Sequence, residues 1–159
     1  MRIVRDLQSL NADDVRGIAA SRSATVAIGE GEIAGYGAAA LLLADYAVLE
    51  RGSTLRLELS ALQIAGVIWR LNGYKLFLTG RTTFTSDGAL RLGLCDATEW
   101  SFDGRSALAF DSAAGLIARR GGDALERAEF ARLFATGEPQ EGLAAFLEKR
   151  QARFTAARE

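Results

Sequence analysis

The 159-residue sequence contains no histidine and a single cysteine, and each scarcity excludes a class of chemistry. Without histidine, the chain cannot form Ser–His or Cys–His nucleophilic pairs, and it lacks the commonest metal ligand. The single thiol, Cys95, cannot form an internal disulfide and is typical of a reducing compartment, so we expect a cytoplasmic protein. A zinc site would have to consist mostly of carboxylates, and we therefore expect no metal. Any catalysis must depend on carboxylates, backbone N–H groups, Tyr, Lys or Arg.

Long hydrophobic segments and a strong net charge are also missing. The first ten residues contain no apolar run of the kind that a signal peptide needs. The longest apolar block, residues 38–44, is far shorter than the roughly 20 residues of a membrane-spanning helix. The net charge of −1 gives the chain no general attraction to nucleic acid or to an anionic membrane. We therefore expect neither as a partner.

The composition is that of one globular domain, with 49% hydrophobic and 25% charged residues. Residues 1–105 are predicted to form an α/β core, and residues 106–159 a C-terminal helical region that serves oligomerisation. The pattern of apolar residues predicts the following strands: Met1–Val4, Ser23–Ile28, Tyr46–Leu49, Ser53–Leu59 and Leu94–Ala97.

Helices are predicted from capping residues and from apolar spacing. Asn11 is a good N-cap for the first helix, with acidic residues in its first turn. Ala38–Leu43 is apolar all round, so it is predicted to be a buried helix. The remaining predicted helices are Leu62–Leu71, Gly73–Leu78, a short helix capped by Ser86, Ser106–Arg120, Ala124–Ala135 and Pro139–Phe154.

Three segments resemble the crotonase (enoyl-CoA hydratase/isomerase) superfamily, in that family's order and with compatible spacing. Thr25–Asp45, TVAIGEGEIAGYGAAALLLAD, is similar to the family's strand, glycine-rich turn and buried helix. Leu78–Asp96, LTGRTTFTSDGALRLGLCD, resembles a stretch in which LTGR precedes a helix. Phe130–Phe154, which contains EGLAAFLEKRQARF, resembles the family's C-terminal helix. The spacing of the glycine-rich turn does not match the dinucleotide-binding fingerprint, which argues against an NAD site.

The resemblance implies an α/β fold, a crotonase-like ββα superhelix that is reduced at the N-terminus and followed by a C-terminal helical region. It also implies trimers or hexamers. Members of the family bind acyl-CoA thioesters and stabilise an enolate-like anion with two backbone N–H groups. An acyl-CoA or a similar thioester would then be a substrate or ligand, and no other cofactor is expected.

One of the two oxyanion donors maps onto the turn Gly35-Tyr36-Gly37, where the resemblance assigns the Tyr36 N–H. A small residue is expected there, so the Tyr36 phenol either points away or fills the acyl site. The second donor normally lies in an upstream loop that also contacts CoA. The residues before Ser23 are predicted to be a strand followed directly by a helix, so this loop is deleted or a partner chain supplies it.

The family's two hydratase glutamates map onto Ala39 and Leu59. Glu58 is one residue away, and in an extended segment this slip turns a side chain to the opposite face. Glu58 is therefore either a general base, if a local bulge redirects it, or a solvated charge. Glu30 and Glu32, which flank the glycine turn, are expected to be loop charges.

Three further residues have a structural and a functional interpretation. Lys149 lies where the family's basic residue reaches the CoA phosphates of a neighbouring subunit, or it is a solvated charge at a helix end. Cys95 occupies an apolar position and is expected to be a core thiol. Asp45 follows the buried helix and is expected to make structural hydrogen bonds.

These residues lead to two hypotheses and leave open whether the chain is an enzyme. The first is a non-hydratase binding, assembly or accessory subunit. The second is a reduced crotonase of the isomerase or decarboxylase type, in which Glu58, Tyr36 or a partner residue transfers the proton. The pocket could also be reused for another small ligand. Four aromatic residues suggest an interface and hence a homotrimer or hexamer: Phe130, Phe134, Phe146 and Phe154.

Overall fold

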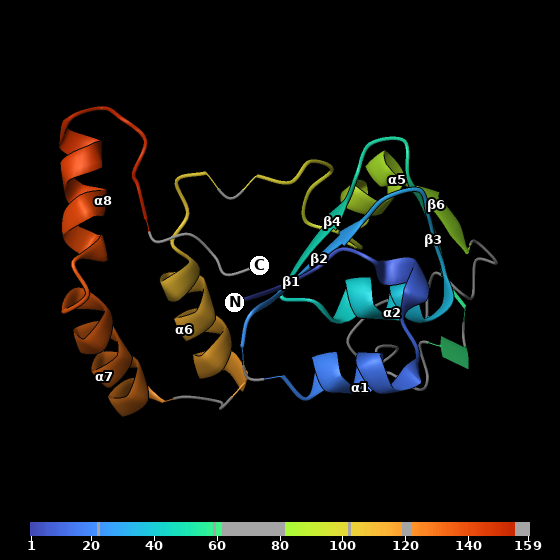
Figure 1. The fold of residues 1–159 in the computed structure, drawn as a ribbon, viewed down its shortest axis with the longest axis horizontal. Helices are drawn as coiled ribbons and strands as arrows, with labels where there is room; N and C mark the ends of the chain where they lie inside the picture. Colours follow the sequence, from blue (N-terminus) through green and yellow to red (C-terminus); the bar gives the residue numbers. More distant parts are fainter. Residues whose placement is uncertain (22, 59, 62–81, 102, 119–121, 155–159) are drawn as a thin grey trace. The chain divides into compact units, whose positions relative to one another are not determined.

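The computed structural model describes residues 1–21, 23–58, 60–61, 82–101, 103–118 and 122–154 (Figure 1). The chain divides into two compact units. The first, here the α/β unit, comprises Ile3–Ser21 and Thr25–Trp100, and the second, the helical unit, comprises Met1–Arg2, Arg22–Ala24 and Ser101–Glu159. The predicted mixed α/β fold with helices at its end is confirmed. The predicted helices Leu62–Leu71 and Gly73–Leu78 lie outside the described residues.

The first sheet has the strand order β1-β2-β4. Its strands are β1 (Arg2–Val4), β2 (Thr25–Gly29) and β4 (Tyr46–Leu49), close to three of the predicted strands. β2 and β4 are parallel, with Val26 opposite Tyr46. All of β2 is buried, which explains its continuous apolar sequence.

The predicted strand Leu94–Ala97 is wrong, because the structure has only an isolated parallel bridge between Val48 and Ala97 there. The Asp96 carboxylate provides the reason. Its Oδ2 accepts a hydrogen bond of 2.7 Å from the Ala47 N–H, which is a group that a regular ladder would pair with a backbone carbonyl.

The second sheet has the strand order β3-β5-β6. Its strands are β3 (Glu32–Ile33), β5 (Thr54–Arg56) and β6 (Thr83–Thr85). β3 pairs with β5 in parallel, so that Glu32 lies opposite Thr54, and β5 pairs with β6 in the antiparallel sense. The glycine-rich segment that was expected to be only a turn therefore contains a short strand.

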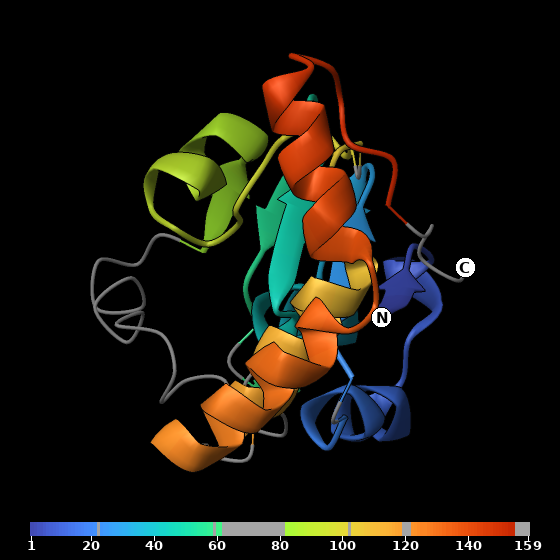
Figure 2. The same ribbon diagram turned by 90° about the vertical axis from the view of Figure 1, so that its left-hand side faces the viewer.

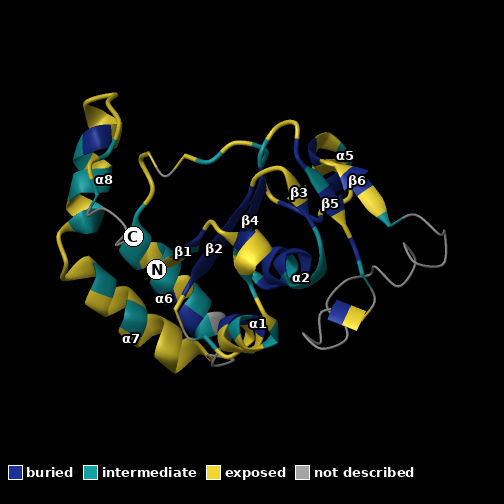
Figure 3. Ribbon diagram, turned by 45° about the vertical axis from the view of Figure 1, so that its right-hand side comes forward, coloured by how far each residue is buried: buried dark blue, intermediate teal, exposed yellow. Residues whose placement is uncertain are grey.

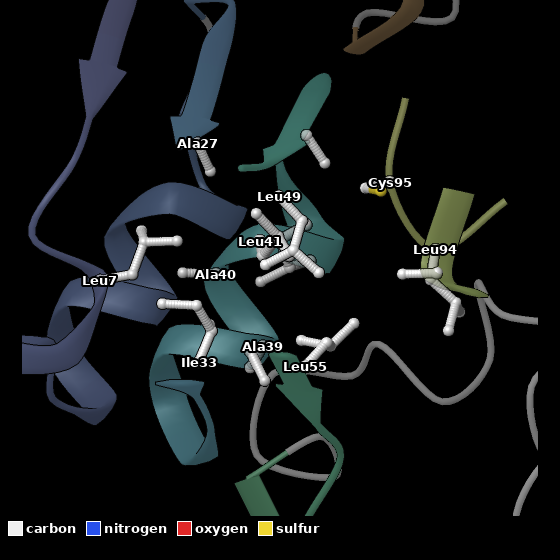
Figure 4. Packing of buried hydrophobic residues seen from close by; sticks show 14 of the residues in the cluster. Leu7, Ala27, Ile33, Ala39, Ala40, Leu41, Leu49, Leu55, Leu94 and Cys95 are labelled. Carbon is white, nitrogen blue, oxygen red and sulfur yellow. The ribbon is translucent and has the colours of Figure 1, made fainter. Parts of the chain in front are cut away.

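Helix α2 (Gly35–Leu43) forms the centre of the α/β unit. Most of its residues are buried, as its uniformly apolar sequence predicts (Figure 3). Ile33 and Leu55 lie beside Ala39 of the helix, and Leu7 lies near Ala40 (Figure 4). The core therefore holds α2 and the turn before it in place.

Helix α1 (Ala12–Ala19) begins at the predicted cap. Asn11 Oδ1 accepts hydrogen bonds from the N–H groups of Asp13 and Asp14, and the Asp14 carboxylate accepts one from the Asn11 N–H. This reciprocal arrangement is a capping box. The strand does not run directly into this helix as predicted, because a 3₁₀ turn, η1 (Leu7–Ser9), lies between them.

Helix α5 (Ser86–Arg91) begins one residue earlier than predicted. Its N-cap is Thr85, whose Oγ1 accepts a hydrogen bond of 3.2 Å from the Gly88 N–H, and Ser86 is the first helical residue. Both residues are chemically suited to capping, so the sequence alone did not separate them.

The helical unit contains α6 (Ala107–Ala118), α7 (Asp123–Phe134) and α8 (Glu138–Leu147). α6 packs beside α7, and a short turn joins α7 to α8 (Figures 1 and 2). The prediction that the last helix reaches Phe154 is wrong. Lys149 takes a φ of +53°, and the Arg150 N–H donates to the Ala145 carbonyl, which ends the helix in a left-handed cap. None of the helices described is both long and apolar enough to cross a lipid bilayer.

Candidate functional site

The candidate site is the glycine turn at the start of α2. Gly35 takes a φ of +54°, a left-handed conformation that favours glycine, and it directs the chain from β3 into the helix. The first hydrogen bond of the helix runs from the Ala38 N–H to the Ala34 carbonyl at 3.2 Å. The Tyr36 N–H precedes it and donates to no described residue. It therefore lies at the positive end of α2, where an anion is stabilised.

The Tyr36 side chain is half-buried and packs against the apolar core. This packing fits either predicted orientation, pointing away from the acyl site or filling it, so both stay predictions. The anchored ring leaves the conformation of the Tyr36 backbone well defined, which is what a fixed N–H donor requires.

Gly37 is required by packing. A methyl group at its Cβ position would lie 2.3 Å from the Leu7 carbonyl oxygen, closer than any van der Waals contact. The η1 turn therefore lies directly on the first turn of α2. The Gln8 amide fastens it there by donating to the carbonyls of Glu30 and Glu32, at 3.0 and 3.4 Å. No motif in the sequence indicates the contact between η1 and α2, which brings Leu7 against Gly37, thirty positions further along the chain.

Glu58 lies beside Gly35. Its Oε2 is 3.5 Å from the position that a methyl group at Gly35 would take. Leu57 is buried and Glu58 half-buried, so the side chains alternate as expected for an extended segment. The Glu58 face is nevertheless the one next to the glycine turn, because β5 pairs with β3 immediately before that turn. The structure thus brings together Gly35, Tyr36 and Glu58.

An arginine links Glu58 to Glu32, which was expected to be a loop charge but lies in β3. Arg56 Nη1 lies 2.9 Å from Glu58 Oε1, and Arg56 Nε lies 3.1 Å from Glu32 Oε1. All three side chains are more than a third exposed, so water screens these attractions strongly. The ion pairs orient the Glu58 carboxylate more than they stabilise the fold.

The resemblance assigns the two hydratase glutamates to the positions of Ala39 and Leu59. Ala39 is completely buried in the core, among apolar side chains. Leu59 lies outside the described residues. No carboxylate from position 39 can therefore serve this site.

A cavity of about 340 Å³ lies beside the same turn. It is lined by Arg5, Asp6, Leu7, Gln8, Glu30, Gly31 and Ile33. Its walls are mainly polar, and neither Tyr36 nor Glu58 belongs to them. The lining residues between β1 and the end of η1, Arg5 to Gln8, were not predicted, because no recognisable sequence motif marks them.

Lys149 belongs to the helical unit, where it is exposed just beyond α8. It takes the left-handed position that glycine usually occupies after a helix, and its charge suits the negative end of the helix dipole. This geometry accounts for the residue as a helix-end charge, and the ligand role stays a prediction.

Asp45 and Cys95 have the structural roles that were expected. The Asp45 Oδ2 accepts a hydrogen bond of 2.8 Å from the Thr25 N–H, and the Asp45 N–H donates to the Thr25 carbonyl at 2.9 Å. Cys95 is buried in the core, and this burial raises the pKa of its thiol. Among the described residues, no three Cys, Asp or Glu side chains are grouped so that they could hold a metal ion.

Comparison with known proteins gives matches at the level of structure. No family model and no curated protein matches the sequence. An enoyl-CoA hydratase from Polaromonas sp. JS666 is 22% identical, with a TM-score of 0.63 over 91% of this chain and 67% of that one. An enoyl-CoA hydratase/isomerase family protein from Hyphomonas neptunium is 25% identical, with a TM-score of 0.61 over 92% and 66%.

A third structure, an enoyl-CoA hydratase from Bacillus anthracis, is 16% identical, with a TM-score of 0.62 over 97% of this chain and 81% of that one. The chain therefore spans about two thirds of the length of the first two proteins and more of the third. The similarity extends over both units. The resemblance found in the sequence is thus confirmed at the level of structure: the chain has the fold of the enoyl-CoA hydratase/isomerase (crotonase) family.

Proposed function

We propose that this chain is a crotonase-fold binding or accessory subunit and that it does not hydrate enoyl thioesters as a classical hydratase does. The burial of Ala39 is the observation that supports this proposal. A pair of carboxylates normally performs the proton transfers of hydration, and each general acid or base contributes about 100- to 10,000-fold to the rate. A methyl group enclosed in the core replaces one of that pair.

The binding role rests on the surroundings of the glycine turn. The Tyr36 N–H offers a fixed donor at a helix N-terminus, and the neighbouring cavity supplies polar groups from Arg5, Asp6 and Gln8. An acyl-CoA, another thioester or a different small ligand would suit this arrangement. A partner chain that supplies a second N–H donor would complete an oxyanion hole.

Self-assembly into a homotrimer or hexamer forms part of the proposal. Phe146 and Leu147 are 79% and 70% exposed, and Leu125 is 48% exposed. Apolar side chains in such numbers on neighbouring helices mark protein–protein interfaces. Light scattering on the full chain tests this point, and a mass equal to one chain would contradict it.

A hydration assay with crotonyl-CoA, run beside calorimetric titration with acetyl-CoA, tests the main proposal. We expect measurable thioester binding without hydration above the rate of buffer. Hydration at a rate typical of enzymes would overturn the proposal. The absence of both binding and hydration in a pure homo-oligomer would leave an assembly role and exclude a thioester-binding role.

The position of Glu58 favours a second candidate function, a reduced crotonase that acts on an acyl thioester. The Glu58 carboxylate would remove a proton from the carbon next to the thioester carbonyl. The Tyr36 N–H would stabilise the oxygen of the resulting enolate, and Glu58 would return the proton to the same or a neighbouring carbon. Fixed N–H donors of this kind are worth about 3–4 kcal/mol each.

Exchange of the C2 protons of propionyl-CoA in D₂O, followed by NMR, tests this candidate because it detects an enolate without requiring hydration. We expect Glu58→Gln to slow the exchange at least 100-fold. Glu32→Gln is the matched control, since Glu32 also pairs with Arg56 but does not contact Gly35. Equal losses in both variants would assign the effect to Arg56, and the absence of exchange in the unmodified chain would exclude the reaction.

A further inference from the structure

A second cavity lies within the helical unit and is unrelated to the glycine turn. It has a volume of about 310 Å³, at the small end of the range of roughly 300–1,000 Å³ for small-molecule sites. Its walls are mostly apolar and include the rings of Phe130, Phe134 and Phe154 together with Leu133 and Pro139. α7 and the start of α8 form most of this groove, and the chain beyond α8 closes one side.

A buried carboxylate interrupts the apolar walls. Glu138 lines the groove, and its Oε2 accepts a hydrogen bond from the Ser106 hydroxyl. Its Oε1 is buried and has no hydrogen-bond partner in the described part of the chain. Buried carboxylate oxygens are almost always satisfied by donors, because leaving one bare forfeits its hydration without replacement. Glu138 Oε1 is therefore a hydrogen-bond acceptor that lacks a donor among the described residues.

Arg150, a cation of the same unit, is not placed to supply the missing donor. Arg150 is engaged elsewhere, with Nη1 and Nη2 at 2.6 and 3.0 Å from the two oxygens of Glu141. Among the described residues that line the groove, none is basic. The negative charge of Glu138 is thus not balanced within the groove.

Aromatic rings line the same groove as this carboxylate. The rings of Phe130 and Phe134 lie 4.8 Å apart between centroids and are tilted by 41°. Phe154 lies against Gly142, with Cζ 3.6 Å from the position of a methyl group there. Phe130 and Phe134 are 63% and 50% exposed, so the groove is open to solvent. The faces of such rings attract cations, and more strongly where water is excluded.

We infer that this groove binds a small organic ammonium compound with an apolar or aromatic body. The ammonium N–H donates to Glu138 Oε1, and its charge faces the phenylalanine rings. The apolar body fills the space between Leu133, Phe134 and Pro139. The size of the cavity favours a free small molecule over a peptide segment. The inference does not depend on thioester binding at the glycine turn.

Calorimetric titration of the full chain with 2-phenylethylammonium tests the inference, with 2-phenylethanol as the neutral compound of the same shape. We expect the ammonium to bind at least tenfold more tightly than the alcohol. Glu138→Gln should raise its Kd at least tenfold. Glu126→Gln, an equal charge change on an exposed position of α7 outside this groove, should leave the Kd unchanged.

A second variant guards against loss of folding in Glu138→Gln. Phe134→Leu keeps the apolar wall but removes a ring, and it should weaken ammonium binding about threefold. Equal affinity for the alcohol, an unchanged Kd in a folded Glu138→Gln variant, or no binding of the ammonium at millimolar concentration would overturn the inference. A second copy of the chain in the groove would also overturn it. In that case the unmodified chain would be an oligomer that does not bind the ammonium, and light scattering would show that Phe134→Leu dissociates it.

Discussion

The α/β unit and the helical unit differ in how their apolar side chains are covered. The apolar core cluster lies entirely in the α/β unit, where Leu41, Leu49 and Leu55 are completely buried. In the helical unit, large apolar side chains such as Phe146 stay exposed, and α7 has no buried residue (Figure 3). Among the described residues, the α/β unit therefore buries most of its large apolar side chains, with Leu90 and Leu92 as 40% and 51% exposed exceptions, and the helical unit leaves more apolar surface available for a partner or ligand.

Polar contacts take a larger part in the helical unit. Arg150 forms a bidentate pair with Glu141, and the Arg153 N–H donates to the same carboxylate at 2.7 Å. The Ser112 hydroxyl donates to Glu129, and Arg132 donates to both. Such contacts fix geometry, but partly exposed ones add little free energy. A substitution in a core should therefore have its largest effect in the α/β unit.

The largest expected effect comes from placing a charge in the centre of α2. Ala39→Glu should lower the free energy of unfolding by at least about 4 kcal/mol, because the new carboxylate has neither space nor a partner in the core. Phe146→Glu, at a position that is 79% exposed, should change it by less than about 0.5 kcal/mol in the monomer. Urea denaturation followed by circular dichroism measures both. Similar losses for the two variants would contradict the difference between the units.

Gly37→Ala should have the next largest effect. The new methyl group would meet the Leu7 carbonyl oxygen at 2.3 Å, so η1 must move away from α2, at a cost of about 1–3 kcal/mol. Gly17→Ala in α1 is the matched control, since nothing lies within 4 Å of its Cβ position. That change should stabilise the chain by about 0.5–1 kcal/mol. An unchanged free energy of unfolding in Gly37→Ala would show that η1 does not pack on α2 as described.

Features that are local in sequence could be predicted, and those that depend on distant pairing could not. The apolar character of residues 38–43 and the cap at Asn11 each depend on a few neighbouring residues, and both predictions are confirmed. The contact of Glu58 with Gly35 depends on the register of β5 against β3, more than twenty residues away. No local pattern specifies that register, so the sequence left the side of Glu58 undecided.

The same reasoning explains the errors at element ends and the missed groove. Lys149 ends α8 in a conformation that glycine normally adopts, so its residue type gave no stop signal. Glu138 lies just before the predicted helix Pro139–Phe154 but is the first residue of α8, and no local pattern distinguishes it from an ordinary acidic residue. Its Oε2 accepts a hydrogen bond from the Ser106 hydroxyl, 32 residues away, and only the structure supplies this pairing.

Asn11→Ala tests a local contribution to the α/β unit. Removing the side chain leaves the N–H groups of Asp13 and Asp14 without their acceptor, which should cost about 1 kcal/mol of unfolding free energy. Asn11→Asp is the matched control, because it keeps an acceptor oxygen at the cap. Urea denaturation at pH 7 should place this control close to the unmodified chain. Equal losses for the two variants would mean that the capping bonds do not stabilise α1.

The smallest expected effect concerns the pair that holds the chain after α8, and its dependence on pH identifies it. Hydrogen bonds from Arg150 and from the Arg153 N–H lower the pKa of Glu141 from its ordinary 4.5 to about 2. A carboxylate with a depressed pKa stabilises the folded state fully above its ordinary pKa and ceases to do so as the pH falls from 4.5 towards 2.

The difference in Tm between the unmodified chain and Glu141→Gln should therefore be constant at neutral pH and shrink over that window. A difference for Glu141→Gln that is the same at pH 7 and pH 2.5 would mean that the pair does not hold the segment in solution. Because both partners are partly exposed, added salt should reduce the neutral-pH difference as well.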